Sequence, residues 1–201
     1  MATEMRLAFV ARLGLKELQT IRFINQLSEY YDLIILGGDG TPDPEYLVRN
    51  KVLIVSGDED DILITKKARE YNMLIDGRIC EFKGLKIAGV GGLQPHQDIR
   101  RIIREGSNIN ILISHYPPHG CLDKVLIGRK EAHMGIIDLN KLLADNVRLL
   151  MLFTHTNVLG GLCLRNNVVM IGFEGGIGRY AEVFINGILS IGFKYSDLPS
   201  H

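Results

Sequence analysis

The sequence contains no tryptophan, only three cysteines and no excess of either charge. Its 23 Lys and Arg residues balance its 23 Asp and Glu residues, so no net field holds a nucleic acid or an anionic membrane surface. No apolar run approaches the roughly 18 to 20 residues of a membrane-spanning helix, and residues 1–10 lack the pattern of a signal peptide. We therefore expect a cytoplasmic protein without a membrane partner, for which nucleic acid is not favoured.

The three cysteines, Cys80, Cys121 and Cys163, lie far apart and show no C-x-x-C spacing. An odd number of scattered cysteines without a secretory signal is typical of an intracellular protein in which thiols stay reduced. The sequence therefore predicts three reduced, semi-buried thiols.

The chain has 201 residues, of which 46% are hydrophobic. This length allows one sizeable core and is short for two well-formed domains. We therefore expect a single domain over residues 1–201, with a homo-oligomer left open.

Apolar runs and helical periodicity alternate along most of the chain, which indicates an α/β protein. Predicted strands cover residues 6–11, 32–36, 51–55, 109–114 and 149–153. Predicted helices cover residues 15–30, 62–71, 95–105 and 135–146, with a short one at 45–49. Asp60 and Asp61 precede the second of these long helices and are predicted to cap it.

Other segments favour antiparallel strands or a loop. Residues 79–82 and 85–90 flank the turn Lys83-Gly84 and predict a hairpin, and the four short runs after residue 161 predict a β meander. A long loop is expected from residue 115 to about 134. Together these elements predict two sheets with helices outside them.

Four predicted strands are each followed by a polar residue that can bind a metal ion. These residues are Asp39, Asp58, His115 and His155. If the four runs are strands of one parallel sheet, all four side chains lie at its carboxyl edge, where open α/β sheets bind ligands. Two carboxylates and two imidazoles suit one divalent ion of the Mn, Zn or Fe class.

The order of these motifs resembles that of the calcineurin-like metallophosphoesterases. The series is Gly38-Asp39, then Gly57-Asp58-Glu59, then His115 shortly before Pro117-Pro118, then His155-Thr156-Asn157. The resemblance implies an α/β fold with four layers, α/β/β/α, built on two mixed sheets. It also implies two metal ions that share a bridging carboxylate, here Asp39, and act on a phosphoester. Asp39, Asp58, His115 and His155 then correspond to the ligands of the second metal.

The sequence departs from the family pattern mainly at the first metal. The family's Asp-x-His-Gly motif is Ala11-Arg12-Leu13-Gly14 here, so two ligands of that metal are missing. Asn157 replaces a third ligand of the same metal. Glu59 stands where the family has the His that protonates the leaving oxygen, and is the candidate replacement for that acid.

These departures predict at most one divalent metal ion, or none, and a weak phosphoester hydrolase at best. Arg12 and Asn157 are candidates for binding a small phosphoester or phosphate, and Arg12 could instead pair with Asp39. One alternative is a non-catalytic scaffold or binding module on the same fold. Another is an unrelated doubly wound nucleotide-binding protein, although the predicted β meander does not suit it.

Overall fold

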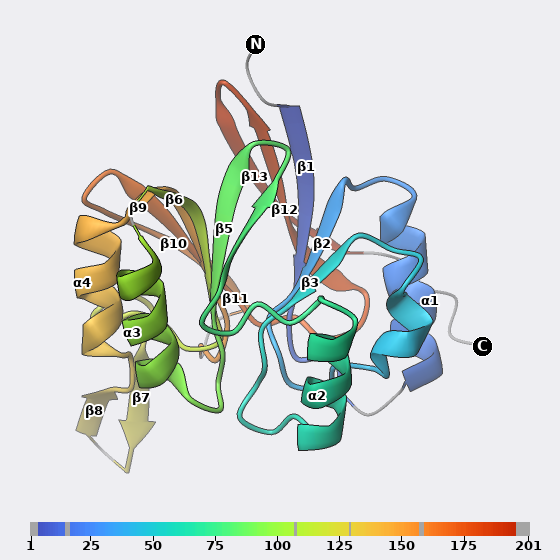
Figure 1. Cartoon of the computed structure of the whole chain (residues 1–201). Coiled ribbons are helices and arrows are strands. Elements are labelled where there is room, and N and C mark those ends of the chain that lie inside the picture. The colour runs from blue at the N-terminus through green and yellow to red at the C-terminus, as the bar shows by residue number, and fades with distance from the viewer. Residues whose placement is uncertain (1–3, 15–16, 107, 129, 157–158, 196–201) are drawn as a thin grey trace.

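Two mixed β-sheets form the centre of the molecule (Figure 1). The computed structural model describes residues 4–14, 17–106, 108–128, 130–156 and 159–195. Sheet A has five strands in the order β13-β12-β1-β2-β3, and sheet B has six in the order β10-β11-β9-β6-β5-β4. Each sheet contains both parallel and antiparallel neighbours, as predicted.

The strand bounds follow the apolar runs of the sequence closely. Sheet A contains β1 (Glu4–Val10), β2 (Leu33–Leu36), β3 (Val52–Ile54), β12 (Arg179–Asn186) and β13 (Leu189–Tyr195). Sheet B contains β4 (Ile79–Phe82), β5 (Leu85–Val90), β6 (Ile109–Ser114), β9 (Val147–Phe153), β10 (Gly160–Arg165) and β11 (Val168–Phe173).

Helices cover the outer face of each sheet. The described helices are α1 (Glu17–Ser28), α2 (Ile62–Glu70), α3 (Pro95–Glu105) and α4 (Ile137–Asp145), with a 3-10 turn η1 (Pro44–Leu47). In α1 the buried residues Phe23, Ile24 and Leu27 fall on one helical face and pack on sheet A. Figure 1 shows α3 and α4 together on the opposite side, where they pack on sheet B.

The alternating directions of the side chains along β1 show how the layers are separated. Met5, Leu7 and Phe9 point into the core between the two sheets, whereas Ala8 and Val10 point toward the helices. Successive side chains of a strand face opposite sides, so one strand serves two apolar layers. The structure is therefore an α/β fold with the predicted layers α/β/β/α. The single domain over residues 1–201 stays a prediction.

Three expectations about strands are wrong. The strands that precede the four polar residues do not share a sheet, because β2 and β3 belong to sheet A and β6 and β9 to sheet B. The predicted meander is divided, because β10 and β11 extend sheet B while β12 and β13 extend sheet A. The predicted loop contains a hairpin of β7 (Lys124–Ile127) and β8 (Lys130–His133), which projects beside α3 and α4 (Figure 1).

The prediction of three reduced cysteines is also wrong. Cys121 and Cys163 form a disulfide, which joins the segment before β7 to strand β10. The pair is brought together by the sheet, across 42 residues of sequence. Cys80 is the one free cysteine in the described residues and is partly buried. No described helix is long and apolar enough to cross a membrane.

Removal of the disulfide is expected to destabilise the protein. Replacing both Cys121 and Cys163 with Ser should lower the free energy of unfolding by about 2 to 4 kcal/mol, because the open chain regains loop entropy when it unfolds. Urea denaturation measures this change, and Cys80→Ser is the matched control. A double variant as stable as the Cys80→Ser protein would contradict the expectation.

Candidate metal centre

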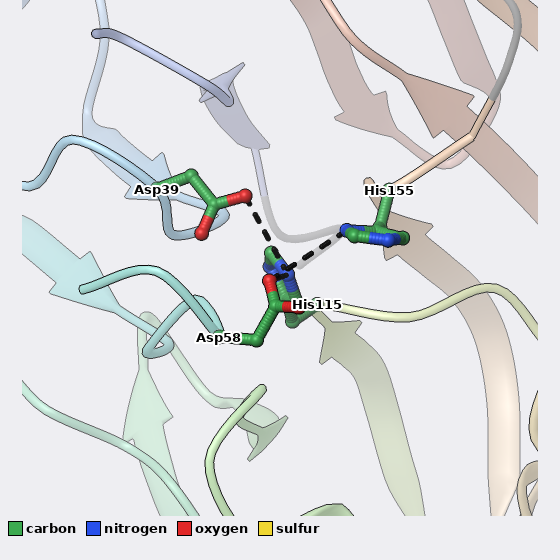
Figure 2. Close-up of side chains that lie close together, drawn as sticks. All are labelled: Asp39, Asp58, His115 and His155. Carbon is green, nitrogen blue, oxygen red and sulfur yellow. Dashed lines mark hydrogen bonds and ion pairs between the residues drawn. The ribbon is translucent and has the colours of Figure 1, made fainter.

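The four polar residues converge in space although they come from two sheets. Asp39 follows β2 and Asp58 follows β3, while His115 follows β6 and His155 follows β9. One ligand atom from each residue lies within 4.8 Å of the ligand atoms of the others. Figure 2 shows the four side chains pointing toward a common region from separate strand ends.

His115 is at the centre of this group and is fully buried. Its Nδ1 lies 2.8 Å from the Gly37 carbonyl oxygen, which can only accept, so Nδ1 carries a proton and donates. Its Nε2 faces the two carboxylates, 3.0 Å from Asp58 Oδ1 and 3.7 Å from Asp39 Oδ2. A backbone carbonyl that fixes the ring in this way is the usual partner of an imidazole that binds metal through its other nitrogen.

His155 supplies a buried nitrogen to the centre. Its Nδ1 is buried and makes no hydrogen bond within the described part of the chain. The closest carboxylate oxygen, Asp58 Oδ1, is 3.7 Å away. For bonds of about 2.1 Å, the ligand atoms of a tetrahedral site are roughly 3.4 Å apart. Three separations between imidazole nitrogens and carboxylate oxygens, at 3.0 to 3.7 Å, are close to this value, and all four ligand atoms lie within 4.8 Å of one another.

The loops of the two sheets touch because glycines lie between them. A Cβ added at Gly57 would overlap the backbone nitrogen and Oδ1 of Asp39. A Cβ added at Gly92, which follows β5, would come within 2.8 Å of the His115 ring. Side chains at these positions would push the carboxylates and the imidazole apart. The glycines therefore permit the close approach that the site requires.

Asp60 joins two of the loops and does not cap α2. Its carboxylate accepts hydrogen bonds from the backbone N–H groups of Gly40, Thr41 and Gly57, at 2.7 to 3.2 Å. Asp61 is the residue that caps the helix, through the Leu63 N–H. The prediction that both residues cap α2 is therefore wrong for Asp60, which holds the Asp39 loop against the Asp58 loop.

The backbone at three positions of the site adopts a conformation that is unfavourable for residues other than glycine. Arg12, Asp39 and His155 have φ angles of 55°, 58° and 56°. Such left-handed conformations cost about 1 kcal/mol or more for most residues and persist where surrounding contacts enforce them. Their grouping at one edge of the two sheets indicates that the edge is shaped for function.

The two carboxyl groups of the centre differ in acidity. Burial raises the pKa of Asp39 and outweighs the opposite effects of His115 and the Glu59 N–H. Burial also acts to raise the pKa of Asp58, but the hydrogen bond and charge of His115 and the charge of His155 outweigh it, so this pKa is lowered. A cation at the centre would favour the ionised form of both.

Comparison with solved structures identifies the fold. One crystal structure aligns with a TM-score of 0.66 and 13% identity, over 96% of this chain and 99% of its own. A conserved protein of Streptococcus pneumoniae, described as a predicted phosphoesterase, aligns with a TM-score of 0.54 and 12% identity, over 100% of this chain and 95% of its own. A putative 5'-nucleotidase of Staphylococcus aureus, in complex with alpha-ketoglutarate, aligns with a TM-score of 0.55 and 12% identity, over 98% of this chain and 55% of its own.

This chain has the calcineurin-like metallophosphoesterase fold. The resemblance in motif order is thereby confirmed at the level of the fold. No protein-family model matches the sequence, and no curated protein matches it.

Two positions at which the calcineurin-like motif has ligands of the first metal are apolar in this chain. Ala11 and Leu13 stand at the two missing ligand positions, and both are buried in hydrophobic clusters. Arg12 between them forms an ion pair with Glu174, at 2.9 Å, rather than with Asp39. Asn157, the third altered position, lies outside the described residues.

Glu59 stands where the calcineurin-like motif has its His acid, and its role as an acid stays a prediction. Its backbone N–H donates to Asp39 Oδ1, at 3.2 Å, while its side chain is exposed. The side chain lines an acidic cavity of about 270 Å³ next to the centre. The residues that line this cavity include Glu17, Asp43, Asp60 and Asp61.

Three residues near the centre were not predicted from the sequence. Glu174 directly follows β11, so it carries the same signal as the four predicted ligands: a polar residue at the end of an apolar run. Tyr116 packs edge-on against the rings of His115 and His155, at centroid distances of 4.9 and 5.1 Å. Asp76 accepts hydrogen bonds from both the N–H and the hydroxyl of Ser56, and so fixes the start of the loop that carries Asp58.

A side chain at Gly57 is expected to disrupt the centre. Gly57→Ala should weaken binding of a divalent ion at least about tenfold and lower stability by about 1 to 3 kcal/mol, because the new methyl group overlaps Asp39. Gly192→Ala is the control, since its Cβ would meet nothing closer than Lys194 Cε at 3.4 Å. Metal titration and urea denaturation measure both effects, and equal affinities in the two variants would contradict the expectation.

Proposed function

We propose that this chain binds one divalent metal ion of the Mn, Zn or Fe class and slowly hydrolyses a small phosphoester. The observation that carries the proposal is the convergence of Asp39, Asp58, His115 and His155. The buried Nδ1 of His155 makes no hydrogen bond to any residue that the structure describes. The chemistry of this donor set suits the ion, because two carboxylates offset its charge in a partly buried place.

When bound, the ion supplies Lewis acidity toward a phosphoryl oxygen and lowers the pKa of a water molecule. The chain's own groups act around it. His115 holds its Nε2 toward the centre through the Gly37 carbonyl, and Asp60 keeps the two carboxylate loops together. Arg12 is half exposed, and its guanidinium is held by Glu174, so it can bind the oxygens of a phosphate.

The replacement of first-metal ligands by Ala11 and Leu13, and of the His acid by Glu59, limits the expected rate. A positioned general acid typically contributes about 10² to 10⁴-fold to a hydrolysis. Glu59 is exposed, so its proposed role as the acid requires that it turn toward the leaving oxygen when substrate binds. Slow turnover is therefore the expected behaviour of this centre.

A non-catalytic binding module is the second candidate function. The burial of Ala11 and Leu13 in apolar clusters favours it, because these positions cannot regain a first metal without loss of the core. The ion pair of Arg12 with Glu174 favours it too, because it places a fixed cation next to the centre without any metal. In this case the site binds a phosphate group and releases it unchanged.

Loss of one ligand is expected to remove one metal ion per chain. His155→Ala should contain one ion fewer than the unaltered protein by elemental analysis. Saturating Mn²⁺ or Zn²⁺ at about 100 times the dissociation constant adds about 2.7 kcal/mol of stability through this site. His96→Ala, which removes an exposed His paired with Asp138, should keep the full metal content. Equal metal content in the unaltered protein and His155→Ala would contradict the proposed centre.

Turnover of bis-p-nitrophenyl phosphate separates the two candidate functions. If the chain is a hydrolase, it should release p-nitrophenol slowly and only with metal, and the rate should fall at least about tenfold in His115→Ala and His155→Ala. Arg12→Ala should mainly raise KM, because it removes a contact to the phosphate rather than to the ion. Metal binding without any turnover above buffer would support the binding module instead.

A further inference from the structure

A second group of metal-binding side chains lies outside the centre described above. It consists of His119, Asp123 and His133, and one ligand atom from each lies within 4.8 Å of the others. His119 and Asp123 lie on the segment that leads into β7, and His133 is the last residue of β8. Four of the five His residues in the described part of the chain therefore fall into two separate clusters.

Asp123 is a buried carboxylate that is aimed at the two imidazoles. Its Oδ2 accepts hydrogen bonds from the N–H groups of Gly120 and Gly135, at 3.0 and 3.1 Å. Its Oδ1 lies 2.7 Å from Nδ1 of His133. The Asp123 side chain is 0% exposed, whereas that of His133 is 41% exposed. A buried carboxylate requires a cation or strong donors nearby, and here solvent reaches the cluster from the His133 side.

The ring of His119 lies beside that of His133, with 5.0 Å between the centroids. Within the described residues the His119 ring makes no hydrogen bond, although its backbone makes several. Its N–H donates to the Ile136 carbonyl, and its own carbonyl accepts from Asn140 and Arg165. The backbone is therefore fixed while the imidazole is left available to a ligand.

The segments that carry the three side chains are also fixed to the rest of the fold. Cys121, between His119 and Asp123, is joined by the disulfide to β10. The carbonyl of Asp123 accepts from the Met134 N–H, and His133 pairs with Lys124 across the hairpin. Ligands held in place before binding lose little conformational freedom when a metal ion binds.

We propose that His119, Asp123 and His133 bind one ion of the Zn²⁺ class, with a water-accessible fourth position. Two imidazoles and one carboxylate are a donor set that Zn²⁺ takes in proteins, commonly with a water as the remaining ligand. On binding, the ion takes the place of the proton between His133 Nδ1 and Asp123 Oδ1, and the neutral imidazole carries its proton on Nε2 instead, after exchange with solvent. The ion fastens the end of β8 to the disulfide-linked segment, and so holds the β7–β8 hairpin in place.

The structure also contains a contrasting pair. His96 Nδ1 lies 2.9 Å from Asp138 Oδ2, but both side chains are more than half exposed and no third ligand joins them among the described residues. This pair is an ordinary surface contact. It provides the matched control for the cluster, because it has the same two residue types without the second imidazole and without the buried carboxylate.

Zn²⁺ titration by calorimetry in the His155→Ala background tests the proposal, with the disulfide intact and no thiol reductant. This background removes the first centre, so the result does not depend on the proposed function. The His155→Ala protein should bind one Zn²⁺ per chain. Adding His119→Ala should weaken this binding by at least about 100-fold, since loss of even an outer-shell partner commonly costs 10- to 100-fold. Adding His96→Ala should leave the affinity unchanged.

His119→Ala keeps the hydrogen bond between Asp123 and His133, so a folded hairpin is expected in this variant. Unchanged circular dichroism and melting of the metal-free protein verify that fold. Failure of the His155→Ala protein to bind Zn²⁺, or equal affinity in the His119→Ala and His96→Ala variants, would overturn the proposal. Those results would leave Asp123 and His133 as a hydrogen-bonded pair that supports the hairpin.

Discussion

The approach of two carboxylates to one buried imidazole organises the candidate centre. Asp39 and Asp58 both face Nε2 of His115, whose other nitrogen is held by the Gly37 carbonyl. In the proposed state, a metal ion among these groups offsets their negative charge. The close glycine contacts, the left-handed backbone at Asp39 and His155, and the Asp60 hydrogen bonds all serve to hold these groups together.

The location of the centre explains why it joins two halves of the molecule. Sheet A contributes the carboxylates and sheet B contributes the imidazoles, so the site lies where the carboxyl ends of the two sheets meet. The positions of its ligands therefore depend on how the two sheets pack, and a large apolar core holds the sheets together. Ala11 extends that core, and Leu13 extends the separate cluster between sheet A and its helices, to the positions where the calcineurin-like motif has ligands of a first metal.

Much of the arrangement could be predicted from the sequence because its signals are local. A polar residue after a short apolar run marks a strand end, which was sufficient to single out Asp39, Asp58, His115 and His155. The assignment of strands to sheets could not be predicted, since β2 and β6 carry the same local signal and only long-range pairing separates them. Asp60 was misread because Asp at a loop end is equally suited to a helix cap and to a bridge between loops.

The errors around residues 115–134 have two causes. Strands β7, Lys124–Ile127, and β8, Lys130–His133, are short, and neither alternates apolar with polar residues in the way that predicts a strand. The disulfide that fixes this segment joins cysteines from distant parts of the chain, and spacing alone does not predict such a pair. The hairpin of β7 and β8 brings His119, Asp123 and His133 together, so the second cluster was not apparent without that hairpin.

The central claim is that one metal ion lies among the two carboxylates and two imidazoles. Anomalous diffraction from crystals grown with Mn²⁺ or Zn²⁺ tests it most directly. A single bound ion should give one anomalous peak within bonding distance of Asp39, Asp58, Nε2 of His115 and Nδ1 of His155, with no second peak beside Arg12. A map without a peak at these four side chains, measured at saturating metal, would show that they do not bind an ion.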